Sequence, residues 1–201
     1  MFTGIIQAIG KIAAIEAHGG DKRFHIATGK LDLTATKIGD SIAVSGVCLT
    51  AVQLAADGFW ADVSAETLSC TTCADLQLGA AVNLEQALTP STALGGHLVS
   101  GHVDGVGVIA ERHDDARSVR LRITAPTALA RYIAAKGSIC VDGVSLTVNA
   151  VHGADFELNI VPHTLQETTL GEFAPGRRVN LEVDIIARYL ERLLESRMGD
   201  A

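Results

Sequence analysis

The chain contains SIAVSGVCLT at residues 41–50 and contains it again, slightly changed, as SICVDGVSLT at residues 138–147. The offset is 97 residues, and the same offset carries VNLE from residues 82–85 to residues 179–182. The two halves align almost without gaps, which indicates duplication of one domain of about 95 residues.

A repeat of this length is too long for one unit of a stacked array and long enough for each copy to form its own core. The 201 residues are 48% hydrophobic and 19% charged, which supplies apolar side chains for two small cores. We therefore expect two domains, at residues 1–97 and residues 98–194.

Short runs rich in β-branched residues, separated by turn signals, predict the strands of each copy. In the first copy they lie at residues 4–15, 23–27, 41–52, 59–63 and 81–84, and the second copy repeats them, with 41–52 returning as 138–151. Many short strands at this spacing predict a mainly β fold, a small barrel or sandwich, in which barrel closure removes exposed edges.

Helices are expected between and after the strands. Short ones are predicted at residues 64–74, 127–135 and 162–170. A longer amphipathic helix is predicted at residues 185–198, with Asp184 as its N-cap and Gly199 beyond its C-terminal end. Such a helix either covers a barrel mouth or packs against a partner chain, and we favour a contact between subunits.

Charge and composition exclude several classes of function. The net charge is -7 at pH 7 and the 16 Lys and Arg residues are scattered, so neither a nucleic acid nor an anionic membrane is expected as a partner. The longest apolar stretch, residues 43–56, is too short to span a bilayer. The first residues lack the basic region of a secretory signal, so we expect a cytoplasmic protein.

Four cysteines, at positions 48, 70, 73 and 140, are expected to stay reduced in that compartment. The pair Cys70 and Cys73 has the spacing of half a zinc or redox site, but no second pair or His-x3-His completes four ligands. We expect no metal. A Ser-His-Asp triad is not predicted either, because no Gly-x-Ser-x-Gly elbow is present.

Five motifs in order carry a family resemblance: MFTGII at residues 1–6, GVCLT at 46–50, GGHLVSGHVDG at 95–105, DGVSLT at 142–147 and VNLEVD at 179–184. Together with the duplication, they resemble the riboflavin synthase family from residue 1 to about residue 194. The chain has Ser45 where that family commonly has Asn, and Gln86 where it more often has Arg.

The resemblance implies that each copy is a six-stranded Greek-key β-barrel that binds one 6,7-dimethyl-8-ribityllumazine, and that the subunits form a homotrimer through the C-terminal helix. It implies transfer of a four-carbon unit between two lumazines, which gives riboflavin and 5-amino-6-ribitylamino-uracil. The substrate itself contains an acidified methyl group and an electrophilic ring carbon, so no cofactor is expected.

The positions that match the family's binding motifs are candidates for the substrate site. In the first copy they are Gly4, Ile5, Ile6, Cys48, Leu49, Thr50, Asp62, Val63, Ser64, Ala65, Glu66 and Thr67. In the second copy they are Gly101, His102, Val103, Lys136, Ser145, Leu146, Thr147, Asn159, Ile160, Val161, Pro162, His163 and Thr164.

Cys48 and His102 are the first catalytic candidates. Cys48 can act as a nucleophile or a polarisable wall, although cysteine is also a common small buried residue. His102 has a side chain that exchanges protons near neutral pH, although a single histidine is often structural.

Four further residues complete the catalytic candidates. Ser145 and Thr147, two apart on a strand, point to the same face. Asp184 either caps the helix or also places a carboxylate at the site. Ser41 matches Ser138 across the repeat.

The two copies differ at several matched positions. The pairs are Cys48 with Ser145, Ile5 with His102, Ser45 with Asp142 and Glu66 with His163. These differences suit one donor seat and one acceptor seat, although drift also produces them. The short linker at residues 86–96 favours a near-translational link between the barrels, so that facing seats require a neighbouring chain. The alternative function is a lumazine or flavin carrier without turnover.

Overall fold

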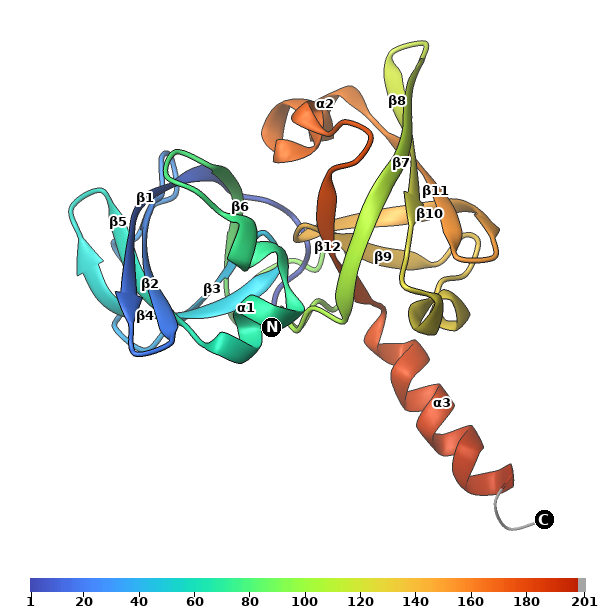
Figure 1. Ribbon diagram of the computed structural model, residues 1–201, viewed down its shortest axis with the longest axis horizontal. Coiled ribbons are helices and arrows are strands. Elements are labelled where there is room, and N and C mark those ends of the chain that lie inside the picture. Colours follow the sequence, from blue (N-terminus) through green and yellow to red (C-terminus); the bar gives the residue numbers. More distant parts are fainter. Residues whose placement is uncertain (199–201) are drawn as a thin grey trace.

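The computed structural model describes residues 1–198, with side chains up to residue 195, and within them the strands form two closed antiparallel barrels (Figure 1). The first barrel contains β1 (Ala8–His18), β2 (Asp21–Ala27), β3 (Ser41–Val44), β4 (Val47–Ala55), β5 (Gly58–Val63) and β6 (Ala81–Gln86). Their order around the barrel is β1-β2-β5-β4-β3-β6, and β6 pairs with β1 to close it.

The second barrel repeats this order one copy later. It contains β7 (Gly105–Asp115), β8 (Ser118–Thr124), β9 (Ser138–Val141), β10 (Val144–His152), β11 (Asp155–Ile160) and β12 (Arg178–Val183). Each barrel has its own core, around Phe24 and Phe59 in the first and around Ile123 and Phe156 in the second. The mainly β fold, the duplication and the six-stranded Greek-key barrels are confirmed.

Residues 41–52 do not form the single run that the sequence predicts. Ser45 and Gly46 make a two-residue turn between β3 and β4, with φ angles of 45° and 80°. Asp142 and Gly143 make the same turn in the second copy, with φ angles of 44° and 85°. A hairpin turn with two positive φ angles favours Asn or Asp followed by Gly. Gly46 and Gly143 therefore suit the second position of these two turns.

The predicted short helices are broken. Residues 64–74 form α1 (Ala65–Cys70) and the 3-10 helix η1 (Thr72–Asp75), because Thr71 between them is extended and accepts the Cys73 N–H at 3.1 Å. In the second copy α2 (Pro162–Glu167) and η3 (Thr169–Glu172) are separated in the same way by Thr168. Residues 127–135 form only the 3-10 helix η2 (Thr127–Tyr132).

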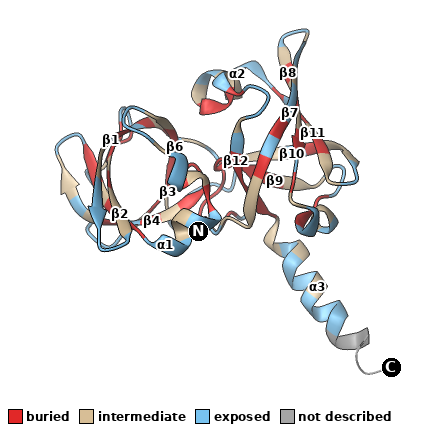
Figure 2. Ribbon diagram, in the orientation of Figure 1, coloured by how far each residue is buried: buried red, intermediate tan, exposed pale blue. Residues whose placement is uncertain are grey.

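The C-terminal helix α3 (Ile185–Met198) projects from the second barrel and is largely exposed (Figures 1 and 2). Asp184 caps it, because its Oδ1 atom accepts the Ile186 N–H at 3.0 Å. Gly199 lies outside the described residues. The described helices include none with the length and hydropathy needed to cross a bilayer.

A pseudo-twofold axis relates the two barrels. The Asn83 side chain donates from Nδ2 to the carbonyl of Asp142 at 2.8 Å, and Asn180 donates in the same way to the carbonyl of Ser45 at 2.9 Å. Exchanging the two copies turns each of these hydrogen bonds into the other, as a twofold axis requires. The expected near-translational link is therefore wrong, because a translation would not make contacts reciprocal.

The Asp142 carboxyl group lies buried at this barrel interface, where the first copy has Ser45. Burial raises the pKa of Asp142 to about 7, although its hydrogen bond from the Asn180 N–H opposes the shift. Because the folded pKa lies above the unfolded one, the stabilising contribution of this group is complete below its unfolded pKa. It is lost progressively as pH rises to about 7.

We expect the free energy of unfolding of Asp142→Asn to exceed that of the parent by an amount that grows as pH rises. The amide keeps an acceptor for the Asn180 N–H and removes the buried charge, so its advantage should grow by about 2 kcal/mol between pH 5 and pH 8. Urea unfolding at both pH values measures this, with Asp114→Asn on the surface as control. Parallel pH curves for parent and variant would contradict the assignment.

Candidate functional site

Two extended segments, residues 1–7 and residues 98–104, lead into the barrels; we call them the first and second straps. They pair with each other at one antiparallel bridge. The Phe2 N–H donates to the Val99 carbonyl at 2.7 Å, and the Val99 N–H donates to the Phe2 carbonyl at 3.1 Å. Both side chains are buried. The bridge therefore forms a wall between the two barrels.

Beyond this bridge each strap crosses to the other barrel. The carbonyl of Gly4 accepts the N–H of Ser145 at 2.8 Å, and the carbonyl of Gly101 accepts the N–H of Cys48 at 2.9 Å. The sequence assigns Gly4 to the first copy and Gly101 to the second, and their N–H groups do bind Glu85 and Glu182 of those copies, whereas their carbonyls contact the other barrel. The antiparallel pairing sends the straps in opposite directions, which linear sequence order does not reveal.

Glycine is required at both crossing points. Gly4 and Gly101 have φ angles of 75° and 79°, in the left-handed region that disfavours side chains. A Cβ atom on either would lie 2.6 Å from the Cβ of Ser145 or Cys48. These contacts bring each strap against the strand that carries the candidate nucleophilic group.

Buried carboxylates hold the straps in place. Glu85 accepts the N–H and the hydroxyl of Thr3 at 2.7 and 2.6 Å, and its second oxygen accepts the Gly4 N–H at 2.9 Å. Glu182 makes the same three bonds to Ser100 and Gly101. Burial raises the pKa of Glu85 and of Glu182, and the hydrogen bonds oppose the rise. The repeated VNLE motif signalled these residues, but sequence analysis gave them no role.

The first seat is the surface around Cys48 on β4 and His102 on the second strap. Thr50 lies two residues from Cys48, on the same strand face, and Ser41 on β3 pairs with Thr50. Cys48 is half-buried and His102 is exposed. Val103 packs against the first barrel. The structure thus brings Cys48, Thr50 and His102 to one barrel, although the sequence divides them between two copies.

Residues 62–67 border the first seat at the end of β5. Asp62 forms two hydrogen bonds with the Arg23 guanidinium, at 2.6 and 3.0 Å, and this pairing lowers the pKa of Asp62. Ser64 caps α1 by accepting the Thr67 N–H at 3.1 Å. Of the other candidates here, Ala65 and Glu66 are exposed.

Some candidate positions point into the barrel cores. The side chains concerned are those of Leu49, Val63 and Ile160. They shape the barrel walls, so only their backbone atoms are available to a ligand. Leu146 also packs on the second core, although it is half-buried.

The second seat is the surface around Ser145 on β10 and the first strap. Thr147 shares the strand face of Ser145, as the sequence predicts. Ile5 on the strap is exposed, whereas Ile6 packs against the second core. The remaining candidates lie at the end of β11, after it, or before β9: Asn159, Val161, Pro162 and His163 are exposed, Thr164 is half-buried, and Lys136 has a φ angle of 67°.

His97 is the main candidate that sequence analysis missed. Its Nδ1 atom lies 2.7 Å from the Ser145 hydroxyl, and its ring is buried. Its buried Nε2 atom has no hydrogen-bond partner within the described part of the chain. Burial lowers the pKa of His97, and the charge of Asp184 only partly opposes this.

A neutral His97 gives the second seat a chemistry that the first seat lacks. In the tautomer with the proton on Nε2, Nδ1 accepts the Ser145 proton and makes that hydroxyl oxygen a better acceptor or nucleophile. Asp184 caps α3, and its charge opposes the lowering of the His97 pKa; a direct role at the site stays a prediction. In the first seat Cys48 takes the place of Ser145, and the residue one repeat after His97 is Leu194.

The cysteines at positions 48, 70, 73 and 140 are free thiols. Cys70 ends α1 and is exposed, whereas Cys73 lies buried in η1, so the pair does not converge on one site. Burial raises the pKa of Cys73 and that of Cys140. No cluster of three or more His, Cys, Asp or Glu suited to a metal occurs among the described residues.

Comparison with known proteins agrees with the duplicated architecture. The lumazine binding domain family model matches residues 3–87 and residues 100–184. The chain is 52% identical to a riboflavin synthase of Photobacterium phosphoreum, over 96% of this chain and 89% of that protein. It is 48% identical to the riboflavin synthase of Photobacterium leiognathi, over 97% of this chain and 89% of that protein.

A solved structure has the same fold. LumP complexed with riboflavin aligns with a TM-score of 0.85 at 27% identity, covering 91% of this chain and 99% of LumP. LumP complexed with 6,7-dimethyl-8-(1'-D-ribityl) lumazine aligns with a TM-score of 0.82 at 26% identity, with the same coverage of both chains.

Proposed function

The chain belongs to the riboflavin synthase family of duplicated lumazine-binding domains, and from this premise we propose how its seats perform the reaction. The enzyme transfers a four-carbon unit between two 6,7-dimethyl-8-ribityllumazine molecules. The products are riboflavin and 5-amino-6-(D-ribitylamino)uracil. One lumazine donates this unit and the other receives it, so atoms and electrons balance without an external oxidant or reductant.

The observation that carries this proposal is the pair of equivalent seats with unequal chemistry. Each seat combines one barrel with the strap of the other copy, so the two seats are built from equivalent segments. The first seat offers the Cys48 thiol and the His102 imidazole, whereas the second offers the Ser145 hydroxyl held by His97. Two molecules of one substrate can thus be bound alike and treated differently.

The protein contributes orientation and proton transfer. Holding two substrates in a reactive geometry can lower the barrier by about 7–11 kcal/mol. His102 is exposed on its strap, so it can take or return a proton at the substrate methyl group. The His97–Ser145 pair can bind or activate a group at the ring carbon of the facing substrate.

The two facing seats come from different subunits. Within one chain the straps run in opposite directions from the Phe2–Val99 bridge, one to Ser145 and the other to Cys48. This divergence, rather than a translation, supports pairing the first barrel of one chain with the second barrel of its neighbour. The family resemblance favours a cytoplasmic homotrimer, in which α3 supplies the subunit contact.

The apolar face of α3 supports that contact. Ile186, Tyr189, Leu190, Leu193 and Leu194 are each more than half exposed in the single chain. Figure 2 shows how little of this helix packs on its own barrel. A second copy that covers these side chains would remove them from water.

Incubation of the purified chain with the lumazine tests the function, with riboflavin absorbance as the readout. Accumulation of riboflavin together with the pyrimidine product is expected. A carrier protein is the alternative, since LumP has the same fold and its solved structures are complexes with riboflavin or the lumazine. Tight binding without riboflavin formation would favour the carrier, whereas 52% identity to a synthase against 27% to LumP favours the enzyme.

Cys48→Ser and His102→Ala are each expected to lower kcat roughly tenfold to hundredfold while changing lumazine binding less, because both groups act on the chemical step. Steady-state kinetics and fluorescence titration separate the two effects. His152→Ala, at an exposed strand end in the second barrel, is the matched control. Parental kcat in both site variants would remove these residues from the mechanism.

A further inference from the structure

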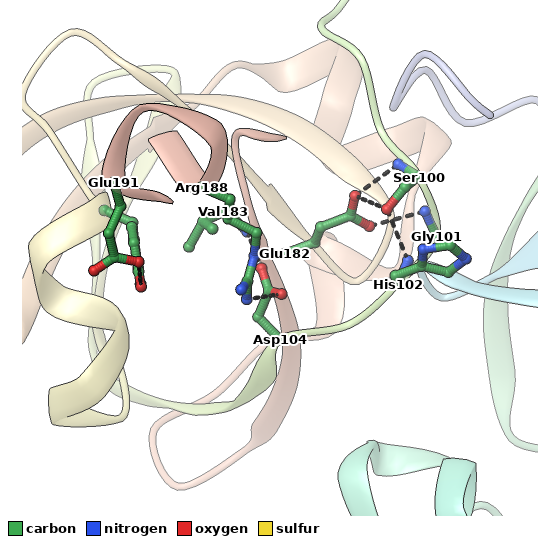
Figure 3. Close-up of polar contacts among 9 residues, drawn as sticks. Ser100, Gly101, His102, Asp104, Glu182, Val183, Arg188 and Glu191 are labelled. Carbon is green, nitrogen blue, oxygen red and sulfur yellow. Dashed lines mark hydrogen bonds and ion pairs between the residues drawn. The ribbon is translucent and has the colours of Figure 1, made fainter. Parts of the chain in front are cut away.

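The second strap is fixed on both sides of His102. Glu182 holds the Ser100–Gly101 side through the three hydrogen bonds described above. Asp104 holds the other side, because its Oδ2 atom accepts the Val183 N–H at 2.7 Å and its own N–H donates to the Leu181 carbonyl at 2.8 Å. Figure 3 shows Ser100, Gly101 and His102 beside the Glu182 carboxylate, with Asp104 further along the strap next to Arg188.

Asp104 has an additional partner on the C-terminal helix. The Arg188 guanidinium of α3 donates to its Oδ1 atom (Figure 3). The Asp104 side chain is only 9% exposed and that of Arg188 is 45% exposed, so solvent reaches this ion pair mainly from the arginine side. A hydrogen bond between two charged groups is also about twice as strong as one between neutral groups. The first turn of α3 is thus tied directly to the strap.

The first strap lacks this tie. Gln7 stands at the position of Asp104, and its Oε1 atom accepts the Gln86 N–H at 2.9 Å, as Asp104 accepts that of Val183. The position equivalent to Arg188 is Ser91, whose hydroxyl lies 3.1 Å from that of Thr89 in the linker. The ionic clamp therefore belongs only to the strap that carries a histidine.

Arg188 is itself placed by the packing of α3. One turn later, Glu191 accepts the Tyr132 hydroxyl proton and pairs with Arg131 at 2.8 Å. The Arg188 guanidinium also lies over the Tyr132 ring, 5.6 Å from its centroid. A rotation of α3 would break these contacts and move Arg188 away from Asp104. The helix direction and the strap position are thus coupled through one residue.

We propose that Arg188 is a positioning residue that clamps Asp104 and so fixes His102 in the first seat, making the geometry of that seat depend on how α3 is packed. This inference rests on the proposed function. It adds a link between the helix expected to form the subunit contact and a candidate proton-transfer group. A pocket lined by His102, Asp104, Arg188 and Tyr189 lies where strap and helix meet.

A double-mutant cycle tests the clamp in the full-length protein. Asp104→Asn keeps an acceptor for the Val183 N–H and removes the charge, whereas Arg188→Gln removes the cation. Each is expected to lower kcat about tenfold or more with little change in KM, and the double variant should be no slower than the slower single variant. Arg188→Lys should restore part of the rate, and sedimentation should show the parental assembly.

Arg192→Gln is the control, because Arg192 lies on the same helix, is exposed and pairs only with Glu195 at 3.8 Å among the ion pairs of the described residues. It should retain the parental rate. Parental kcat in Arg188→Gln, or fully additive effects in the double variant, would overturn the clamp.

A second readout separates the clamp from the proposed function. The imidazole NMR signal of His102, assigned with His102→Gln, should shift in Arg188→Gln and Asp104→Asn but not in Arg192→Gln. An inactive parent would contradict the enzyme while leaving this comparison valid. An unmoved His102 signal in the variants would overturn the clamp whatever the turnover.

Discussion

Removal of residues 185–201 is expected to leave two folded barrels that still bind lumazine but to lower turnover by at least about a hundredfold. Each barrel closes on itself and has its own core, so neither requires α3 to fold. The truncated chain should be a monomer, with its two seats diverging on either side of the Phe2–Val99 bridge. Sedimentation and steady-state kinetics on the same sample measure both effects, and a fully active monomer would contradict the shared site.

Truncation also removes Arg188, so a point variant is needed to isolate assembly. Leu190→Glu places a charge on the exposed apolar face of α3. Arg188 lies two residues away and so points to the opposite side of the helix, where its ion pair with Asp104 is retained. It should weaken assembly and turnover together, with activity recovering at high protein concentration. Arg192→Gln again serves as the control on the same helix.

Mixing two inactive variants gives an independent test of a site shared between chains. One chain would carry a first seat damaged by Cys48→Ser, and the other a second seat damaged by His97→Gln. In randomly mixed trimers about a quarter of the facing pairs would combine two intact seats. Recovery of roughly that fraction of activity is expected, whereas a site within one chain predicts no recovery above the two separate variants.

His97→Gln is expected to lower kcat by about 10²–10³ while lumazine binding changes little. The imidazole is held neutral by burial and directs its Nδ1 atom to the Ser145 hydroxyl, so its loss removes an acceptor from the chemical step. Ser145→Ala should have a similar effect, and the double variant should be no slower than either single variant. His113→Gln, exposed on β7, is the control.

The pH dependence sharpens this test. Because burial lowers the pKa of His97, the parental kcat should fall only at pH values below the ordinary titration range of histidine. His97→Gln should lose that acid limb and keep the limb that belongs to other groups. An unchanged profile in this variant would show that His97 supports the Ser145 strand rather than the proton transfer.

The fold was largely predictable because the two copies share motifs that can be aligned in the sequence. Repeated strand motifs predicted two barrels, and the cap at Asp184 predicted where α3 begins; both are confirmed. The strand breaks were missed because Ser45–Gly46 and Asp142–Gly143 lie inside continuous apolar runs. The short helices were drawn too long because the threonine side chains at positions 71 and 168 cap a new 3-10 turn there.

The arrangement of the candidate site was less predictable. The motifs identified the residues, but the straps are paired by contacts between Gly4 and Ser145 and between Gly101 and Cys48, far apart in sequence. Alignment of the copies therefore did not reveal that each strap also contacts the other barrel. His97 was missed because the residue one repeat later is Leu194 and so gives no repeated signal, although its position after Gly95 and Gly96 offered one. A Cβ on Gly96 would lie 2.7 Å from that of Ser145.

The crossing of the straps has an evolutionary consequence. A single-copy ancestor could have completed its seat only by exchanging straps with a second identical chain, as in a domain-swapped dimer. Both seats of that dimer would have been the same. Fusion of two genes ended this constraint, since a substitution in one half no longer appeared in the other. Glu85 and Glu182 still make equivalent hydrogen bonds in the two copies, whereas Cys48 and Ser145 differ at matched positions, as expected after the two seats had specialised.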